Sequence, residues 1–173
     1  KKILTELDID PRRMDVGGAI EIISKVKTEA NPISREPYMD SRWRELYDKY
    51  QKTLLACGAL DFDDLMVLPL HILASDSDIR DRERARLDWV LVDEYQDVNR
   101  PQYLLLRCLV DSGRKIMVVG DPDQSIYGWR GADMGMILNF ENDFKNAKVV
   151  VLDQNYRSTG NILDGANGVI KNN

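Results

Sequence analysis

Residues 89–94, which read WVLVDE, decide the fold of this chain. Four apolar residues in a row are typical of a short buried strand, and the two carboxylates mark its end. Similar apolar runs lie at residues 115–120 (KIMVVG) and 148–152 (KVVVL), and an acidic residue follows each of them. Helical patterns separate the three runs. We therefore expect an α/β fold with three parallel strands and helices on both faces of the sheet.

The helices of this second half are expected at about residues 101–110, 133–140 and 159–170. Pro101 suits the first turn of its helix, because proline lacks the N–H that would have no partner there. Ser158 or Thr159 is expected to cap the last helix.

The apolar spacing in the first 88 residues predicts helices and no strands. A first helix is expected to start at Asp10-Pro11 and to stop at Asn31-Pro32. Gly58 is expected to end a second helix. The apolar face of the first helix comprises Ala19, Ile22, Ile23 and Val26. The apolar face of the second helix comprises Trp43, Leu46, Tyr47, Tyr50 and Leu54.

A third helix is expected after Asp61, its predicted cap, and Pro69 should kink it or end it. Residues 76–88 alternate acidic side chains with arginine, which is typical of a solvated helix face.

Composition limits the function. The chain has 24 basic and 29 acidic side chains, a net charge of −5, so any nucleic-acid contact should be local. Cys57, Cys108 and His71 are too few for structural zinc, which takes about four ligands. We expect both cysteine side chains to be buried in the protein, and we expect the protein to lie in a reducing, cytoplasmic compartment. No apolar run approaches the ~20 residues of a membrane span.

Polar residues follow all three predicted strands, where open parallel sheets bind ligands. Asp93 after the first strand suits a Mg²⁺ ligand, and Glu94 suits a base that activates water for attack on a γ-phosphate.

The loop at residues 120–133 reads GDPDQSIYGWRGAD and is expected to turn tightly. Gln124 could sense a phosphate oxygen. Tyr127, Trp129 and Arg130 set two aromatic rings beside a cation, a combination suited to stacking on unpaired bases. The alternative is that Trp129 packs in the core.

The third polar string is LDQNYRST at residues 152–159. Arg157 just before a helix could reach a γ-phosphate, and Tyr156 could stack on a base. A Tyr-Arg pair by itself is more often an ordinary feature of the surface.

These three strings resemble motifs II, III and IV of the UvrD/Rep/PcrA family of superfamily 1 DNA helicases. Residues 60–65, LDFDDL, also resemble a segment of that family, and Val98 and Pro122 are departures from its common motifs. The resemblance spans roughly residues 35–173 and, judged by order and spacing, the whole chain.

The resemblance implies a role for each matching residue. Asp93 would hold Mg²⁺, Glu94 would be the general base, and Gln124 would contact the γ-phosphate and couple it to DNA. Tyr127 and Trp129 would stack on single-stranded DNA, with Arg130 beside them. Tyr156 would stack near the adenine of ATP, and Arg157 would reach the γ-phosphate from the second motor domain.

The same resemblance implies three parts. Residues 1–86 would be a helical insertion domain, 87–145 the end of a first RecA-like domain of the P-loop NTPase type, and 146–173 the start of a second one. A phosphate-binding loop needs Gly-Lys-Ser/Thr, and no glycine here precedes lysine. The chain also lacks an initiator Met. We therefore expect an internal piece of an ATP-dependent 3′-to-5′ helicase that is inactive by itself.

The expected partners are single-stranded DNA, duplex junctions and repair or replication proteins, in a bacterial cytoplasm close to the nucleoid. Two alternatives remain open. One is a binding module without ATPase activity. The other is a metal-dependent nuclease that would use Asp61, Asp63, Asp64 and Asp93.

Overall fold

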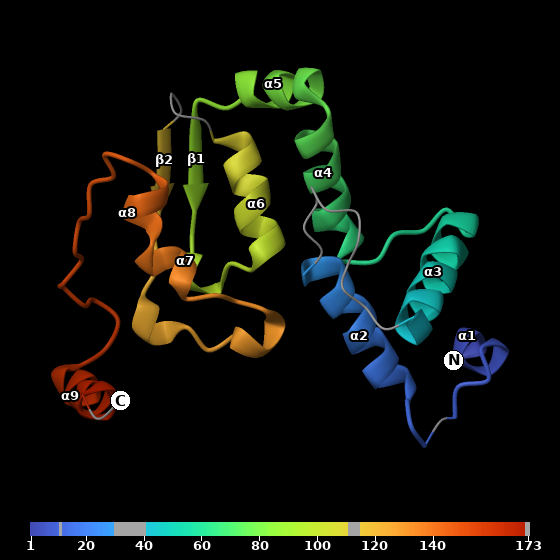
Figure 1. The fold of residues 1–173 in the computed structure, drawn as a ribbon. Coiled ribbons are helices and arrows are strands. Elements are labelled where there is room, and N and C mark those ends of the chain that lie inside the picture. Colours follow the sequence, from blue (N-terminus) through green and yellow to red (C-terminus); the bar gives the residue numbers. More distant parts are fainter. Residues whose placement is uncertain (11, 30–40, 111–114, 172–173) are drawn as a thin grey trace.

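The computed structural model describes residues 1–10, 12–29, 41–110 and 115–171. It contains a helical N-terminal half, then a small sheet with helices packed on it, and finally a separate C-terminal helix (Figure 1). The elements are α1 Lys2–Glu6, α2 Val16–Glu29, α3 Ser41–Ala56, α4 Asp64–Ser75, α5 Ser77–Ala85, β1 Trp89–Val92, α6 Arg100–Leu109, β2 Lys115–Val118, α7 Gly135–Leu138, α8 Phe140–Asp143 and α9 Gly160–Ile170.

The start of α2 differs from the expected one. The Asp10 side chain accepts a hydrogen bond from the Arg12 N–H at 2.9 Å, in a turn that precedes the helix. Asp15 is the residue that accepts from the Gly18 N–H, at 2.7 Å, so α2 starts at Val16. Pro11 and the expected stop at residues 31–32 lie outside the described residues.

Helix α3 ends as predicted, because Gly58 has a positive φ of 62° and the Ala59 N–H returns to the Leu54 carbonyl at 3.0 Å. Helix α4 continues through Pro69 to Ser75, so Pro69 does not end the helix, and the alternative that it kinks the helix stays a prediction. Buried Leu70 and Leu73, on a helix that packs against α6, support the turn in which Pro69 removes one backbone hydrogen bond.

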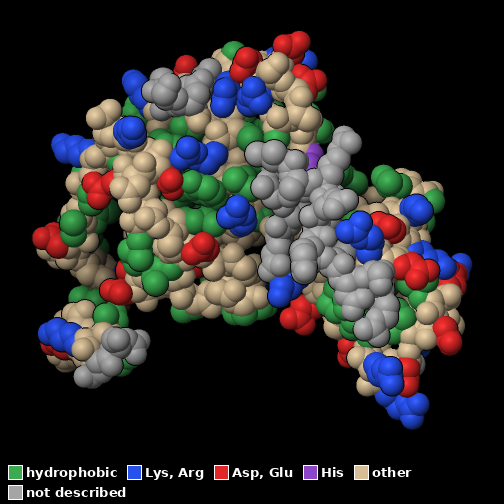
Figure 2. All heavy atoms as spheres, in the orientation of Figure 1, with side chains coloured by type: hydrophobic (Ala, Val, Ile, Leu, Met, Phe, Trp, Pro, Cys, Tyr) green, Lys and Arg blue, Asp and Glu red, His purple; other side chains and the backbone are tan. Residues whose placement is uncertain are grey.

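Helix α5 exposes most of its alternating charges as predicted, although the Arg84 side chain is only 19% exposed and donates to the Cys108 carbonyl at 2.7 Å. Acidic and basic side chains are mixed over this helix at the top of Figure 2. Neighbouring pairs such as Arg86 and Glu83, 2.8 Å apart, partly neutralise one another. This surface therefore has no strong single sign of charge.

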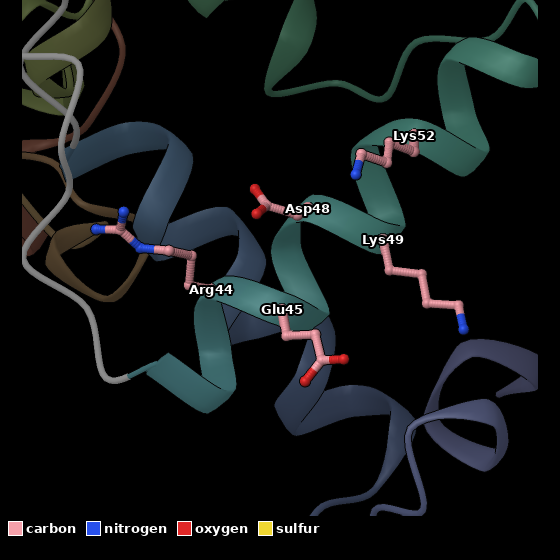
Figure 3. A pocket seen from close by; sticks show the side chains of 5 residues that line it. All are labelled: Arg44, Glu45, Asp48, Lys49 and Lys52. Carbon is pink, nitrogen blue, oxygen red and sulfur yellow. The ribbon is translucent and has the colours of Figure 1, made fainter.

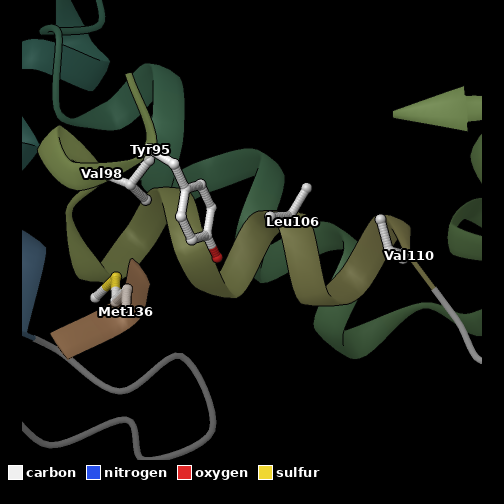
Figure 4. Packing of buried hydrophobic residues seen from close by; sticks show 5 residues of the cluster. All are labelled: Tyr95, Val98, Leu106, Val110 and Met136. Carbon is white, nitrogen blue, oxygen red and sulfur yellow. The ribbon is translucent and has the colours of Figure 1, made fainter. Parts of the chain in front are cut away.

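The sheet has two parallel strands, β1 and β2, with Val92 opposite Val118 in the register. Helix α6 connects them. One face, with Val90 and Ile116, packs on a core of Tyr95, Val98, Leu106, Val110 and Met136 (Figure 4).

The other sheet face is open, with Trp89 54% and Leu91 70% exposed. The prediction of a buried strand covered on both faces was therefore wrong for the described part of the chain.

Residues 148–152 form no strand, which corrects the prediction of a third one. Val151 and Leu152 are 79% and 81% exposed. A strand needs a neighbour to receive its backbone hydrogen bonds, and this segment instead runs away from the sheet toward α9 (Figure 1). The helix expected at residues 133–140 also differs. It breaks into α7 and α8 at Asn139, whose side-chain amide donates to the Gly135 carbonyl at 2.8 Å.

Two smaller predictions had mixed outcomes. Helices α6 and α9 match their expected spans, and Thr159 is the N-cap residue of α9, without a side-chain hydrogen bond. Cys57 is exposed just beyond the end of α3, contrary to the expected burial, and Cys108 is partly buried. Among the described residues, none of the helices has the length and apolar character needed to cross a bilayer.

Candidate functional site

The parallel pairing of the strands brings two of the three predicted strand ends together. Beyond the strands, the Val119 N–H donates to the Val92 carbonyl at 2.8 Å, and the Tyr95 N–H donates to the Val119 carbonyl at 2.9 Å. These bonds set residues 93–94 beside residues 120–121. The third end, at residues 152–154, is not at this edge, because its strand does not form.

Within the part of the chain that the structure describes, each of the two adjacent carboxylates has one oxygen held by a protein N–H. Asp93 Oδ1 accepts the Glu94 N–H at 2.9 Å, and Glu94 Oε2 accepts the Gln96 side-chain amide at 2.7 Å. Both residues are exposed. An exposed carboxylate with an available oxygen fits Mg²⁺, which typically takes one or two carboxylates and completes its shell with water and phosphate oxygens.

Gln96 is a site residue that the sequence did not reveal. It is 1% exposed, and its Oε1 accepts the Asp121 N–H at 3.0 Å. Its backbone carbonyl accepts the Ser125 hydroxyl at 3.2 Å. No local pattern separates such a glutamine from an exposed one, since both its partners outside the 93–97 string lie more than 20 residues further along the chain.

The predicted phosphate sensor, Gln124, lies on the loop beside these carboxylates. Asp121 organises the turn, because its side chain accepts the Asp123 N–H at 3.0 Å and the Gln124 amide at 2.7 Å. Gln124 is exposed, at the end of the short 3-10 helix Pro122–Gln124. Its amide nitrogen is thus held toward Asp121 at the surface.

The aromatic part of the loop is exposed, and its two rings are tilted by 54° to one another. Trp129 is 78% and Tyr127 is 38% exposed, with ring centroids 6.5 Å apart. The Arg130 guanidinium carbon lies 5.2 Å from the Trp129 ring centroid and 5.8 Å from that of Tyr127. Such exposure is inconsistent with the alternative that Trp129 packs in the core.

Tyr156 and Arg157 are placed elsewhere. Tyr156 is 93% exposed, and the Arg157 N–H donates to Asn155 Oδ1 at 2.9 Å in a turn before α9. This turn lies on the segment that leads away from the sheet (Figure 1). The structure does not bring either side chain to Glu94, and their assigned roles stay predictions.

A second polar cluster lies between α2, α3 and α4, around Lys27. The lysine side chain is 1% exposed, and its Nζ lies 2.6 Å from Asp61 Oδ2 and 2.7 Å from Asp64 Oδ1. Tyr50 donates its hydroxyl to Asp61 at 2.9 Å, and Gln51 donates its amide to Asp64 at 3.2 Å. The cluster therefore compensates both carboxylates within the protein.

The N-cap residue of α4 is Asp63, without a side-chain hydrogen bond, which corrects the prediction of Asp61; Asp61 Oδ1 nevertheless accepts the Asp64 N–H at 2.9 Å in the turn before the helix. A sequence signal for Lys27 existed: it follows Ala19 and Ile23 at helical spacing, so it lies on the buried face of α2.

This arrangement corrects the nuclease alternative. Asp61 and Asp64 share the Lys27 ammonium, whereas Asp93 follows β1, in a different part of the fold. Across the described residues, no group of three or more Asp, Glu, His or Cys side chains converges in a metal-binding arrangement. The four carboxylates therefore do not form the single cluster that a metal-dependent nuclease would need.

Among the hollows formed by the described residues, two have a volume of about 390 Å³ each. One lies along α3, where Arg44, Glu45, Asp48, Lys49 and Lys52 fan outward without converging (Figure 3). It contains none of the predicted site residues. The other is lined by Asp93 and Glu94 together with Gln102 and three leucines of α6, among other residues. Because the second hollow is lined by the predicted carboxylates, it is the candidate site.

Comparison with known proteins gives matches over the whole chain. The family model described as UvrD/REP helicase N-terminal domain matches residues 3–145. The chain is 43% identical to the ATP-dependent DNA helicase PcrA of Bacillus subtilis, 41% to that of Leuconostoc citreum and 39% to that of Staphylococcus aureus. Each match covers 100% of this chain but only 24% of the relative's length. By this match and these identities, the chain belongs to the UvrD/REP helicase family.

Proposed function

We propose that this chain is part of an ATP-dependent DNA helicase and carries the carboxylates for ATP hydrolysis together with the loop that holds single-stranded DNA. One observation supports this best: residues 93–94 and the loop at residues 120–130 lie side by side at the end of the β1–β2 pair. The relatives are ATP-dependent DNA helicases, and this chain spans 24% of their length.

In the proposed mechanism, Asp93 binds Mg²⁺, which would neutralise phosphate charge when bound. Glu94 accepts a proton from the attacking water. Gln124 contacts the γ-phosphate, and Tyr127 and Trp129 stack on unpaired bases.

Tyr156 contacts the adenine and Arg157 supplies a cation to the γ-phosphate. Because both residues lie away from Glu94 here, this part requires the segment after residue 145 to close over the nucleotide.

The proposed division follows the sequence: a helical insertion in residues 1–86, the end of one RecA-like domain in 87–145, and the start of a second in 146–173. Closure of the two RecA-like domains on ATP would move the aromatic loop along the strand in the 3′-to-5′ direction. We place the helicase in the bacterial cytoplasm, at nucleoid DNA and duplex junctions, with repair or replication proteins as partners.

Hydrolysis by the full-length helicase tests the assignment. Glu94→Gln keeps the side chain's size and hydrogen bonding but removes the base, so nucleotide binding should persist while turnover is lost. Arg157→Ala should lower turnover by about 10³-fold or more, as expected for a finger arginine. Wild-type turnover in either variant would refute the role assigned to that residue.

The 173-residue chain alone should not hydrolyse ATP, because it supplies no Gly-Lys-Ser/Thr loop for the phosphates. Phosphate release with single-stranded DNA present measures this. A rate in the ordinary enzyme range of ~1–10³ s⁻¹, lost in Glu94→Gln, would contradict the expectation. The alternative of a binding module without ATPase activity predicts instead that the full-length protein binds single-stranded DNA and leaves ATP intact.

A further inference from the structure

Gln96 uses both ends of its buried side-chain amide. The nitrogen donates to Glu94 Oε2 at 2.7 Å, and the oxygen accepts the Asp121 N–H at 3.0 Å. Its backbone carbonyl accepts the Ser125 hydroxyl at 3.2 Å. One residue, 1% exposed, therefore joins the carboxylate of the site to two points of the neighbouring loop.

The Glu94 backbone needs such support. Its φ of 50° and ψ of 45° lie in the left-handed region, which is unfavourable for a residue with a Cβ. Strained residues of this kind persist when their surroundings fix them, and they cluster at functional sites. The bond from Gln96 fixes the direction of the Glu94 carboxylate on this strained backbone.

Gly120 shows how closely the loop approaches this amide. A Cβ added at Gly120 would lie 2.6 Å from Gln96 Oε1 and 2.9 Å from the Ile137 side chain. Real Cβ contacts do not come so close, so only glycine leaves room for the amide. The start of the loop is therefore shaped around Gln96.

We propose that Gln96 is a positioning residue that orients Glu94 and ties it to the loop at residues 121–130, so that the DNA-binding loop and the hydrolytic base move together. This inference rests on the proposed helicase function. The chain of contacts is short: Trp129 and Tyr127 lie on the same loop as Asp121 and Ser125, which both bond to Gln96. The effect of unpaired nucleobases binding to the two rings would thus be transmitted to Glu94, the general base, through the Gln96 side chain.

The test uses the full-length helicase that contains this chain. Gln96→Met keeps the approximate size of the side chain but removes both of its hydrogen-bonding groups. We expect the kcat of DNA-stimulated ATP hydrolysis to fall about 10- to 100-fold, the effect typical of lost supporting hydrogen bonds at a site. The KM for ATP should stay within about threefold of the wild-type value, because Gln96 touches no substrate. The ratio of the ATPase rates with and without single-stranded DNA should fall toward one.

Two further variants keep the idea testable if Gln96→Met does not fold. Gln96→Glu retains the oxygen that accepts from Asp121 but sets a carboxylate against Glu94, so it should also lower kcat. Gly120→Ala should push the amide aside and lower kcat in the same way. Gln51→Met is the matched control: the Gln51 amide donates to Asp64 at 3.2 Å in the helical half of the chain, so its loss should affect stability but not the stimulation by DNA.

The double variant Glu94→Gln/Gln96→Met should hydrolyse ATP no more slowly than Glu94→Gln alone, since Gln96 acts through Glu94. Folded Gln96→Met or Gln96→Glu with wild-type kcat and wild-type stimulation would overturn the inference. A rise in KM without a fall in kcat would also overturn it. A wild-type protein without ATPase activity would instead refute the proposed function, so the two failures are distinguishable.

Discussion

Replacing Lys27 with Met should destabilise the chain by about 3–5 kcal/mol, the usual effect of removing one partner from a buried ion pair. Methionine fills a similar volume, so the loss comes from charge. The Asp64 side chain, which is 4% exposed, would remain buried without the Lys27 ammonium that lies 2.7 Å from its Oδ1. Asp61, at 22% exposure, would regain only part of its hydration. Because a domain's whole stability is about 5–15 kcal/mol, this change removes a large part of it.

The effect should depend on pH. Burial raises the pKa of Asp61, but hydrogen bonds from Lys27, the Asp64 N–H and Tyr50 outweigh it, and the pKa lies below the ordinary 3.8. A lowered pKa in the folded state means that ionised Asp61 stabilises the fold above pH 3.8 and that this stability is lost as pH falls through the folded pKa. Removing Lys27 removes its hydrogen bond and its charge, so the pKa of Asp61 should rise and ionised Asp61 should stabilise the fold less. The deficit of the variant should therefore be largest near pH 7 and shrink toward pH 4.

Urea unfolding of the 173-residue chain, followed by circular dichroism at pH 7 and pH 4, measures both effects. Adding Asp64→Asn to Lys27→Met should recover part of the loss, because Asn removes a buried charge and keeps an acceptor for its neighbours. Lys49→Met is the control, since Lys49 pairs with exposed Glu6 at 2.7 Å and should change little. A Lys27→Met deficit under about 0.5 kcal/mol at pH 7, as for ordinary surface changes, would refute this account of the cluster.

Trp129→Ala should weaken single-strand binding by the full-length helicase by ~1–3 kcal/mol with little sequence preference. Since Trp129 is 78% exposed, its melting temperature should hold, and lost stability at unchanged affinity would contradict the DNA assignment. Gly58→Ala should destabilise the chain by roughly 1–2 kcal/mol, because φ is 62° and the new Cβ meets no atom within 4 Å, so the effect is one of backbone strain. Gly165→Ala, with similar space but no positive φ on α9, should instead stabilise its helix, and thermal unfolding that ranks the two variants the other way would refute the argument.

The sequence predicted the elements that rest on local signals. The apolar runs that became β1 and β2 are too short and too continuous for helices, and the helical spacing around Leu46 placed α3. Gly58 ends α3 because the chain there adopts the left-handed backbone conformation, which glycine takes up more easily than other residues.

Elements that depend on distant partners were predicted less well. Residues 148–152 form an apolar run with three consecutive valines, which favours a strand locally, but a strand exists only where another receives its hydrogen bonds. Pro69 disfavours a helix locally, yet α4 continues because Leu70 and Leu73, which share one face of the helix, are buried just after it. Tertiary packing outweighed the local preference in both places.

The candidate site divides in the same way. The sequence by itself determined that Asp93 and Glu94 end a strand and that Trp129 lies on a glycine-rich loop, because both follow from order along the chain. Only the tertiary structure decided that Gln96 binds Asp121, 25 residues away, and that Lys27 binds Asp61 and Asp64, 34 and 37 residues away. A buried polar group must find its partner wherever the packed chain brings one, and no local pattern records that choice.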